Sequence, residues 1–321
     1  MIFSILFILL QLILLALMVS PLLISWVDLW WLDNLFNLQL QWSLLAALLL
    51  VPGLKYSRRI SLVLLPVYGL IAAVNFGHLY LSSPPPVAGT FGFSIAQLNL
   101  RYHNPHTADI FTRLAQTDYD ILVLQEISDA SVDMLDRVSA SYPYSIGSGS
   151  ISGYSSRHVL LSKWPLSNRK VHDLGYMEGQ VIDVLVNPSG SGEEIRVLSL
   201  HPGAPRNREL WELRNSTLEF VAREVARTPT QSQIVVGDLN VSPWSTVFQN
   251  LLKMSGLQNS GVGHGYLPSW SLLPHNVTTR LLGSAYIDHC LVSAGFTIGD
   301  KQWQIVEGSD HLLISTQLEV H

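Results

Sequence analysis

The chain divides into a long apolar N-terminal part and a remainder in which short apolar runs alternate with polar segments. Residues 1–26 carry no charge, and residues 1–82 carry only five charged side chains. A charge-free helix of that length reaches across a hydrocarbon layer of about 30 Å. The pattern predicts a membrane anchor at 1–82 with about three transmembrane helices, at 3–25, 38–54 and 60–81, of which the second is short.

Two other interpretations of this apolar part are less favoured. A removable signal peptide should have a basic start and a small-residue cleavage site, and neither is evident in 1–26. A helical hairpin buried in a soluble core is disfavoured because charge-free stretches of this length are rare in soluble proteins. The tryptophans at 30, 31 and 42 suit a membrane–water interface.

Basic residues predict how the anchor is oriented. Lys55, Arg58 and Arg59 lie between the second and third predicted spans, and the positive-inside rule places such a turn in the cytoplasm. With three spans, the chain after Tyr80 is then expected outside the cytoplasmic membrane. The proline-rich segment 83–92 is predicted to be a linker to a domain at 93–321.

The pattern after the linker predicts a domain of strands with interspersed helices. Apolar runs bounded by turn residues predict strands at 93–100, 120–127, 158–166, 179–187, 194–201, 233–240, 285–293 and 311–320. Helical periodicity predicts helices at 107–117, 128–141, 207–228 and 242–256. In 207–228, Leu and Val fall near one face, with Glu and Arg expected opposite. This order suggests two sheets packed together with helices outside.

Charge narrows the classes of partner. The part after residue 82 holds 16 of the 19 basic and 22 of the 24 acidic residues, so it is net acidic. Non-specific affinity for nucleic acid comes from Lys and Arg that replace counterions, so a general polyanion binder is disfavoured. The single cysteine, Cys290, excludes an intramolecular disulfide.

Chemistry-bearing side chains recur at the boundaries of the predicted strands. Taken singly, each has a plain explanation as a turn former, a helix-start charge or a loop histidine. The whole ordered set favours a site that binds a hard cation and moves protons. Its members are Asn99, Glu126, His201, Asp238, Asn240, Asp288, Asp310 and His311.

The motifs around these residues resemble a known superfamily. The ordered set LNL (98–100), LQE (124–126), LSLHPGAP (198–205), VVGDLN (235–240), YIDH (286–289) and GSDH (308–311) is similar to the endonuclease/exonuclease/phosphatase (DNase I-like) superfamily. The resemblance covers about 98–315 and is nearest to membrane-anchored bacterial members. It implies an α+β fold, a four-layer αββα sandwich, here preceded by the helical transmembrane anchor. It also implies a multi-pass protein of the bacterial inner membrane with an extracytoplasmic catalytic domain.

The resemblance also assigns roles. Glu126 would be the main Mg²⁺ ligand, with Asn99 and Asp310 nearby, and Mn²⁺ could replace Mg²⁺. The expected catalytic set is His311, oriented by Asp288; Asp238, acting on the attacking water; Asn240, donating to a phosphate oxygen; and His201, on the other side of the phosphate. Adjacent Asp310 and His311 can both reach one site only where the chain bends at a strand's edge.

Three further residues are candidates for binding substrate. Tyr154 lies where the superfamily often contacts phosphate, and Arg206 follows His201 closely. Arg206 and its neighbour Arg208 could equally be solvated charges at the start of a helix. Trp270, in LPSW, is expected to line the site or pack beneath it.

Three functions stay open at this stage. The first is a membrane-anchored, metal-dependent hydrolase of phosphoester bonds, a phosphodiesterase or phosphatase acting on a lipid or another extracytoplasmic phosphoester. The second is a metal-dependent endonuclease or exonuclease, and the third is a non-catalytic binding module. No protein partner is predicted.

Overall fold

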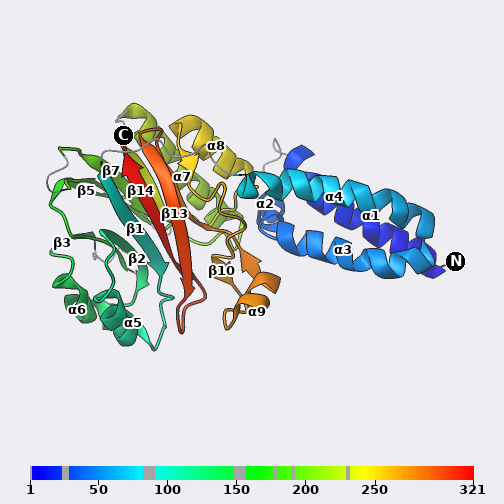
Figure 1. Cartoon of the computed structure of the whole chain (residues 1–321), viewed down its shortest axis with the longest axis horizontal. Coiled ribbons are helices and arrows are strands. Elements are labelled where there is room, and N and C mark those ends of the chain that lie inside the picture. The colour runs from blue at the N-terminus through cyan, green and yellow to red at the C-terminus, as the bar shows by residue number, and fades with distance from the viewer. Residues whose placement is uncertain are drawn as a thin grey trace.

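A computed structural model describes residues 2–23, 29–81, 91–147, 157–175, 179–188, 192–228 and 232–321. Figure 1 shows a strand-rich domain on one side and a bundle of helices that points away from it on the other. The bundle consists of α1 (Ile2–Leu23), α3 (Gln39–Tyr56) and α4 (Arg58–Tyr80), and the short α2 (Trp30–Phe36) lies where the bundle meets the domain.

Two six-stranded sheets form the centre of the domain. The first sheet has the order β13-β14-β1-β2-β4-β3 and the second has the order β5-β6-β7-β8-β12-β9. The first contains β1 (Phe91–Asn99), β2 (Ile121–Ile127), β3 (Tyr144–Gly147), β4 (Arg157–Ser162), β13 (Phe296–Ile305) and β14 (Leu312–Val320). The second contains β5 (Leu166–Asp173), β6 (Gln180–Val186), β7 (Ile195–Leu200), β8 (Gln233–Asp238), β9 (Gln258–Asn259) and β12 (Asp288–Val292).

Helices cover the outer faces of both sheets. The first sheet is covered by α5 (Thr107–Leu114), the 3₁₀ helix η1 (Asp129–Leu135) and α6 (Asp136–Ser139), and the second by α7 (Arg208–Arg227) and α8 (Thr246–Ser255). One apolar cluster fills the space between the sheets, and two others fill the spaces between sheet and helices. These are the four layers, αββα, that the sequence predicts. The small elements β10 (Trp270–Ser271), α9 (Val277–Leu282) and β11 (Ser284–Ala285) lie near the bundle (Figure 1).

The strand predictions are confirmed for all eight runs, with boundaries that differ by a few residues. The pattern missed β5 and β13, among others. Both lie at the edge of a sheet, and most of their side chains are at least partly exposed. A strand with little burial carries little of the apolar alternation on which the prediction depends.

The anchor contains two helices that are long and apolar enough to cross a membrane, α1 and α4. The predicted middle span corresponds to α3, which qualifies only together with α2, and the two helices are bent by 66°. Neutral hydrogen bonds join the helices of the bundle: Gln11 Nε2 donates to Ser61 Oγ (3.1 Å), and Asn75 Nδ2 donates to Met18 O (2.9 Å) and Gln39 Oε1 (3.2 Å). Most of the predicted linker, and Tyr154, lie outside the described residues.

Candidate active site

The predicted polar residues converge because the strands that carry them end at one edge of the sandwich. β1 and β2 run parallel, as do β7 and β8, so Asn99, Glu126, His201 and Asp238 follow neighbouring strand ends. β12 pairs antiparallel with β8 and places Asp288 directly opposite Asp238. β14 also runs antiparallel, so His311 reaches the same edge just before that strand begins.

The backbone at this edge is unusual. Arg101, Glu126 and Asn240 have φ angles of 63°, 56° and 51°, a left-handed conformation that costs a non-glycine residue of order 1–3 kcal/mol. The pairing of β2 with β4 shifts register between Leu124 and Ile127, so Glu126 sits on a bulge. Bulges and strained backbone re-aim side chains at functional sites.

Gly237, in the GDLN motif, allows two strands to approach closely. Its φ is 147°, and a Cβ at this position would lie 2.0 Å from the carbonyl oxygen of Leu200. Only glycine fits there without moving the end of β7. The close approach brings His201 and Asp238 together, with His201 Nδ1 3.5 Å from Asp238 Oδ2.

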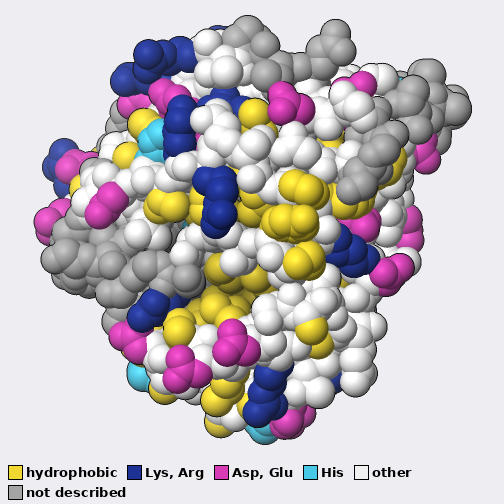
Figure 2. Space-filling model, turned by 90° about the vertical axis from the view of Figure 1, so that its left-hand side faces the viewer, with side chains coloured by type: hydrophobic (Ala, Val, Ile, Leu, Met, Phe, Trp, Pro, Cys, Tyr) yellow, Lys and Arg dark blue, Asp and Glu magenta, His cyan; other side chains and the backbone are white. Residues whose placement is uncertain are grey.

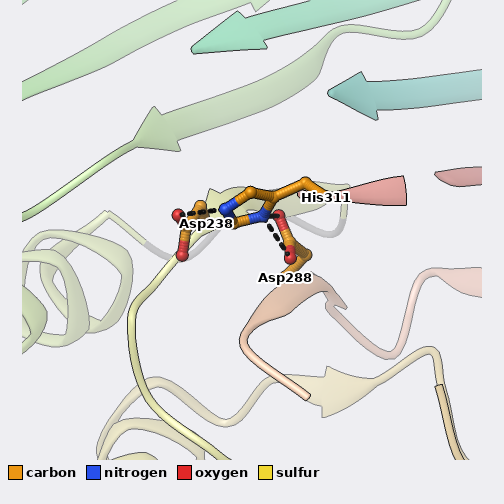
Figure 3. Close-up of side chains that lie close together, drawn as sticks. All are labelled: Asp238, Asp288 and His311. Carbon is orange, nitrogen blue, oxygen red and sulfur yellow. Dashed lines mark hydrogen bonds and ion pairs between the residues drawn. The ribbon is translucent and has the colours of Figure 1, made fainter. Parts of the chain in front are cut away.

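His311 bridges two buried carboxylates, as Figure 3 shows. Its Nδ1 lies 3.0 Å from Asp288 Oδ2, and its Nε2 lies 3.7 Å from Asp238 Oδ2. Burial lowers the pKa of His311, but the charges of Asp288 and Asp238 outweigh it and raise that pKa to about 9. Burial and the charge of Asp288 raise the pKa of Asp238 to about 6. His311 is therefore held as an imidazolium at neutral pH.

Glu126 forms the second half of the site. Its Oε1 accepts from Asn99 Nδ2 (2.9 Å) and lies 3.3 Å from His201 Nε2, and its Oε2 accepts from the Tyr102 backbone N–H (3.0 Å). Burial alone would raise the pKa of Glu126, but the hydrogen bond and charge of His201 hold it well below its usual range. Burial lowers the pKa of His201, whereas Glu126 and Asp238 raise it to about 9.

Asn99 joins the two halves, because its Nδ2 also lies 3.1 Å from Asp238 Oδ2. The residues that this chain of contacts brings together are Asn99, Glu126, His201, Asp238, Asp288 and His311. Glu126 and His311 therefore belong to one cluster of side chains rather than to separate surfaces.

The remaining predicted residues lie around this cluster. One N–H of the Asn240 side-chain amide donates to Pro202 O (2.9 Å), which leaves its other N–H for a ligand. Asp310 Oδ2 accepts from Trp270 Nε1 (2.9 Å), so the two neighbours Asp310 and His311 point to different partners. Arg206 is exposed, on the loop that follows His201.

Two serines that the sequence analysis did not single out also hold the site. Ser269 Oγ accepts from the backbone N–H of Asp288 (3.0 Å). Ser309 Oγ donates to Asn99 O (2.7 Å) and accepts from the His311 N–H (3.0 Å). Their positions in LPSW and GSDH, each beside a predicted site residue, were the signal that could have found them.

The donor set suits a hard divalent cation. Asp238, Asp288 and His311 offer ligand atoms within 4.8 Å of one another, the one such group among the described residues. The Glu126 carboxylate, with 27% of its side chain exposed, is the accessible oxygen donor, and oxygen donors are what Mg²⁺ prefers.

Comparison with known proteins gives the family to which this domain belongs. The model of the Endonuclease/Exonuclease/phosphatase family matches residues 96–311. The chain belongs to this family, whose members are generally hydrolases of phosphoester bonds and usually depend on a divalent metal. A search of curated proteins finds no match.

Solved structures share the fold at low identity. A truncated TDP2 from Caenorhabditis elegans is 17% identical with a TM-score of 0.55, over 72% of this chain and 99% of that one. A family member from Bacteroides vulgatus is 14% identical with a TM-score of 0.58, over 72% and 100%. A beta toxin from Staphylococcus aureus is 17% identical with a TM-score of 0.53, over 70% and 99%.

Proposed function

We propose that this chain is a membrane-anchored, divalent-metal-dependent hydrolase that cleaves a phosphoester in the head group of a membrane lipid. The observation that carries the lipid assignment is an apolar segment that links the site to the bundle. This segment, residues 272–282, comprises a loop and the short helix α9, and we call it the apolar loop. Four of its side chains are exposed although they are large and apolar: Leu272 (73%), Leu282 (61%), Leu273 (46%) and Val277 (46%). An exposed apolar patch of this kind marks a protein or membrane contact.

The apolar loop lies beside the end of the bundle that meets the domain. Gln41, in the first turn of α3, donates to the backbone carbonyls of Leu281 (3.2 Å) and Ser284 (2.9 Å). α3 continues from there with exposed leucines at 44, 45 and 48, which suit contact with lipid tails. A bilayer around the bundle would therefore meet the leucines of the apolar loop as well.

The same loop is fixed to the site. The fully buried Arg280 donates from Nη1 to the carbonyls of Pro268 (3.0 Å) and Ser269 (3.3 Å). Ser269 in turn holds the backbone of Asp288, and Trp270 holds Asp310. A head group drawn to the loop would thus arrive next to the proposed catalytic residues.

The cluster contains the groups that phosphoester hydrolysis needs. Asp238 would orient or deprotonate the attacking water, and the imidazolium of His311, held by Asp288, would stabilise charge on the phosphoryl oxygens. His201 can give a proton to the leaving oxygen, and the free N–H of Asn240 can bind a phosphate oxygen. A cation held by Glu126, with Asn99 and Asp310 nearby, would supply Lewis-acid stabilisation of the phosphoryl charge.

Charge argues against nucleic acid as the main substrate. The part after residue 82 is net acidic. At the end of the domain away from the bundle and the site, Figure 2 shows Lys and Arg scattered among Asp and Glu, so that end carries no continuous basic patch. A nucleic-acid groove should instead gather basic residues.

The anchor's orientation belongs to the same proposal. Lys55 lies in the last turn of α3, and Arg58 and Arg59 begin α4. The turn between these two helices is at the end of the bundle away from the domain (Figure 1). We propose that residues 1–82 cross a bacterial inner membrane more than once, with this basic turn in the cytoplasm. The domain that follows the 83–92 linker would then lie outside, against the outer leaflet.

The test uses the full chain in lipid nanodiscs, with Mg²⁺, Mn²⁺ or chelator. The substrates are phospholipids, bis(p-nitrophenyl) phosphate and single- and double-stranded DNA. We expect cation-dependent cleavage of a phospholipid. The double variant Leu272→Ser/Leu282→Ser should lose about tenfold or more of the lipid activity, because two leucines inserted into the bilayer contribute roughly 3 kcal/mol or more to membrane binding. It should keep its activity on the soluble diester.

The matched control is Met254→Ser, which removes an exposed apolar side chain (42%) from α8. It should leave both activities unchanged. Cleavage of DNA but of no lipid would replace the lipid assignment with a nuclease. Activity that persists in chelator would contradict the metal-dependent mechanism.

A further inference from the structure

One buried ion pair crosses from the anchor into the domain. Asp33 of α2 is the buried charged residue in the described part of the anchor, and Arg214 of α7 is 1% exposed. Arg214 Nη2 donates to Asp33 Oδ2 at 2.6 Å. The same carboxylate accepts from Trp211 Nε1 (2.8 Å) and from the hydroxyl of Ser245. Each oxygen of Asp33 thus has a partner in the domain.

The pair leads directly to the site. Arg214 Nη1 donates to the backbone carbonyl of Asn240 at 2.6 Å. Asn240 has a positive φ, and its side chain donates to Pro202 O, directly after His201. The contacts therefore run from the anchor helix through Arg214 to the strained loop after β8 and on to the loop after β7.

A second contact supports the same loops. Asn34, next to Asp33, donates from Nδ2 to Pro205 O at 2.7 Å. Leu32 and Phe36 of α2 pack in one apolar cluster with Leu312, the residue after His311. Three segments that carry proposed catalytic residues thus rest on one short helix of the anchor.

We propose that Asp33 and Arg214 are positioning residues, through which docked α2 holds Asn240 and the 201–205 loop in the geometry that catalysis needs. This inference rests on the proposed function, since it takes Asn240 and His201 as parts of the site. A tether needs only a linker to raise the local concentration of substrate. A buried, fully bonded carboxylate serves no tethering role, and a buried pair is costly to break because it leaves a charge alone.

A soluble substrate separates positioning from tethering. Asp33→Asn in the full chain removes the charge. Its amide oxygen can still accept from Trp211, and its NH2 group can donate to the Ser245 hydroxyl. With bis(p-nitrophenyl) phosphate in detergent, we expect kcat to fall about 10- to 100-fold and KM to change less than about threefold. A pure tether would leave both parameters unchanged, because this substrate does not come from the membrane.

Two control variants distinguish loss of the Asp33–Arg214 ion pair from a general loss of anchor stability. Trp211→Phe removes one hydrogen bond to Asp33 but keeps the ion pair, and its kcat should stay within about threefold. Gln11→Leu disturbs the interior of the bundle, where Gln11 donates to Ser61, and should leave the kinetics unchanged. A loss in Gln11→Leu equal to that in Asp33→Asn would overturn the proposal, because the effect would then be one of general anchor stability.

Hydrogen exchange tests the proposal without turnover. Asp33→Asn should speed exchange at the backbone amides of 201–206 and 239–245, and Gln11→Leu should not. If the wild-type chain cleaves no phosphoester and this pattern appears, the proposed function fails and the positioning role stands. Unchanged exchange in those segments overturns the positioning role. Should Asp33→Asn not fold, Asn34→Ala gives the same test at 202–206, with a several-fold loss of kcat as the expected result.

Discussion

The active site and the helical bundle both bury polar groups, but they satisfy them differently. In the bundle the buried partners are neutral, such as Gln11 with Ser61 and Asn75 with Gln39. In the site they are ionised, with His311 between Asp238 and Asp288. Neutral hydrogen bonds join apolar helices without the desolvation cost of a charge. The site buries charges in spite of their desolvation cost, and such fixed charges can stabilise a transition state. In this comparison the buried amides of the bundle join helices, and the buried charges of the site are the groups proposed to act on the substrate.

The largest effect on activity is expected when charge is removed from the site. Glu126→Gln and His311→Ala should each lower kcat at least about 100-fold, because each removes a group that we propose acts on the phosphoryl centre. The thermal midpoint should change little by comparison. The assay is cleavage of a soluble phosphodiester by the purified full chain. Glu307→Gln, at a side chain that is 68% exposed, is the control, and an equal loss there would contradict the assignment.

A second test is the response of stability to pH. Burial, then the charge of His201, lowers the pKa of His158 to about 3, whereas an unfolded histidine titrates near 6.5. Between these values the unfolded chain binds the proton and the folded chain does not, so stability falls as pH falls through this window. His158→Gln should make the free energy of unfolding less dependent on pH in this window, by up to about 1.4 kcal/mol per pH unit.

Thermal unfolding in detergent from pH 7.5 to 4.5 measures this effect. His106→Gln, at a side chain that is 39% exposed, should keep the wild-type slope. An identical slope in His158→Gln would show that His158 does not stay neutral in the folded chain.

The smallest expected effect is in the bundle. Asn75→Leu removes the hydrogen bonds to Met18 O and Gln39 Oε1. Hydrogen bonds between membrane helices contribute about 0.6 kcal/mol on average and at most about 1.7, so stability should fall by roughly 1 kcal/mol. The kcat per folded molecule should be unchanged. A large loss of activity would mean that the bundle's interior, and not only α2, shapes the site.

The sequence predicted the layers and the convergence of the site because both depend on strongly patterned, buried strands. Each buried strand carries its apolar run, and the polar residue at its end breaks that run visibly. The edge strand β5 carries no such run, since most of its side chains are at least partly exposed. The roles of the individual site residues stay predictions.

The junction between anchor and domain could not be predicted, and one expectation there was wrong. The periodicity of 207–228 placed its arginines on the outer face of the helix, but Arg214 is buried. Its partner, Asp33, lies 181 positions earlier, and no local pattern connects the two. Asp33 is one of only two acidic residues in the apolar segment 1–82, and this was the available hint that an opposite charge had to be found elsewhere.

Gly237 limits which substitutions this part of the fold can accept. Since no side chain fits between that residue and Leu200, any mutation there displaces the β7 end and the imidazole that follows it. Libraries aimed at new substrates would gain little from randomising the GDLN segment. Diversity is better introduced where the residues are largely exposed, at 206–208 and 272–277. Substitutions there leave the close approach of β7 and β8 unchanged.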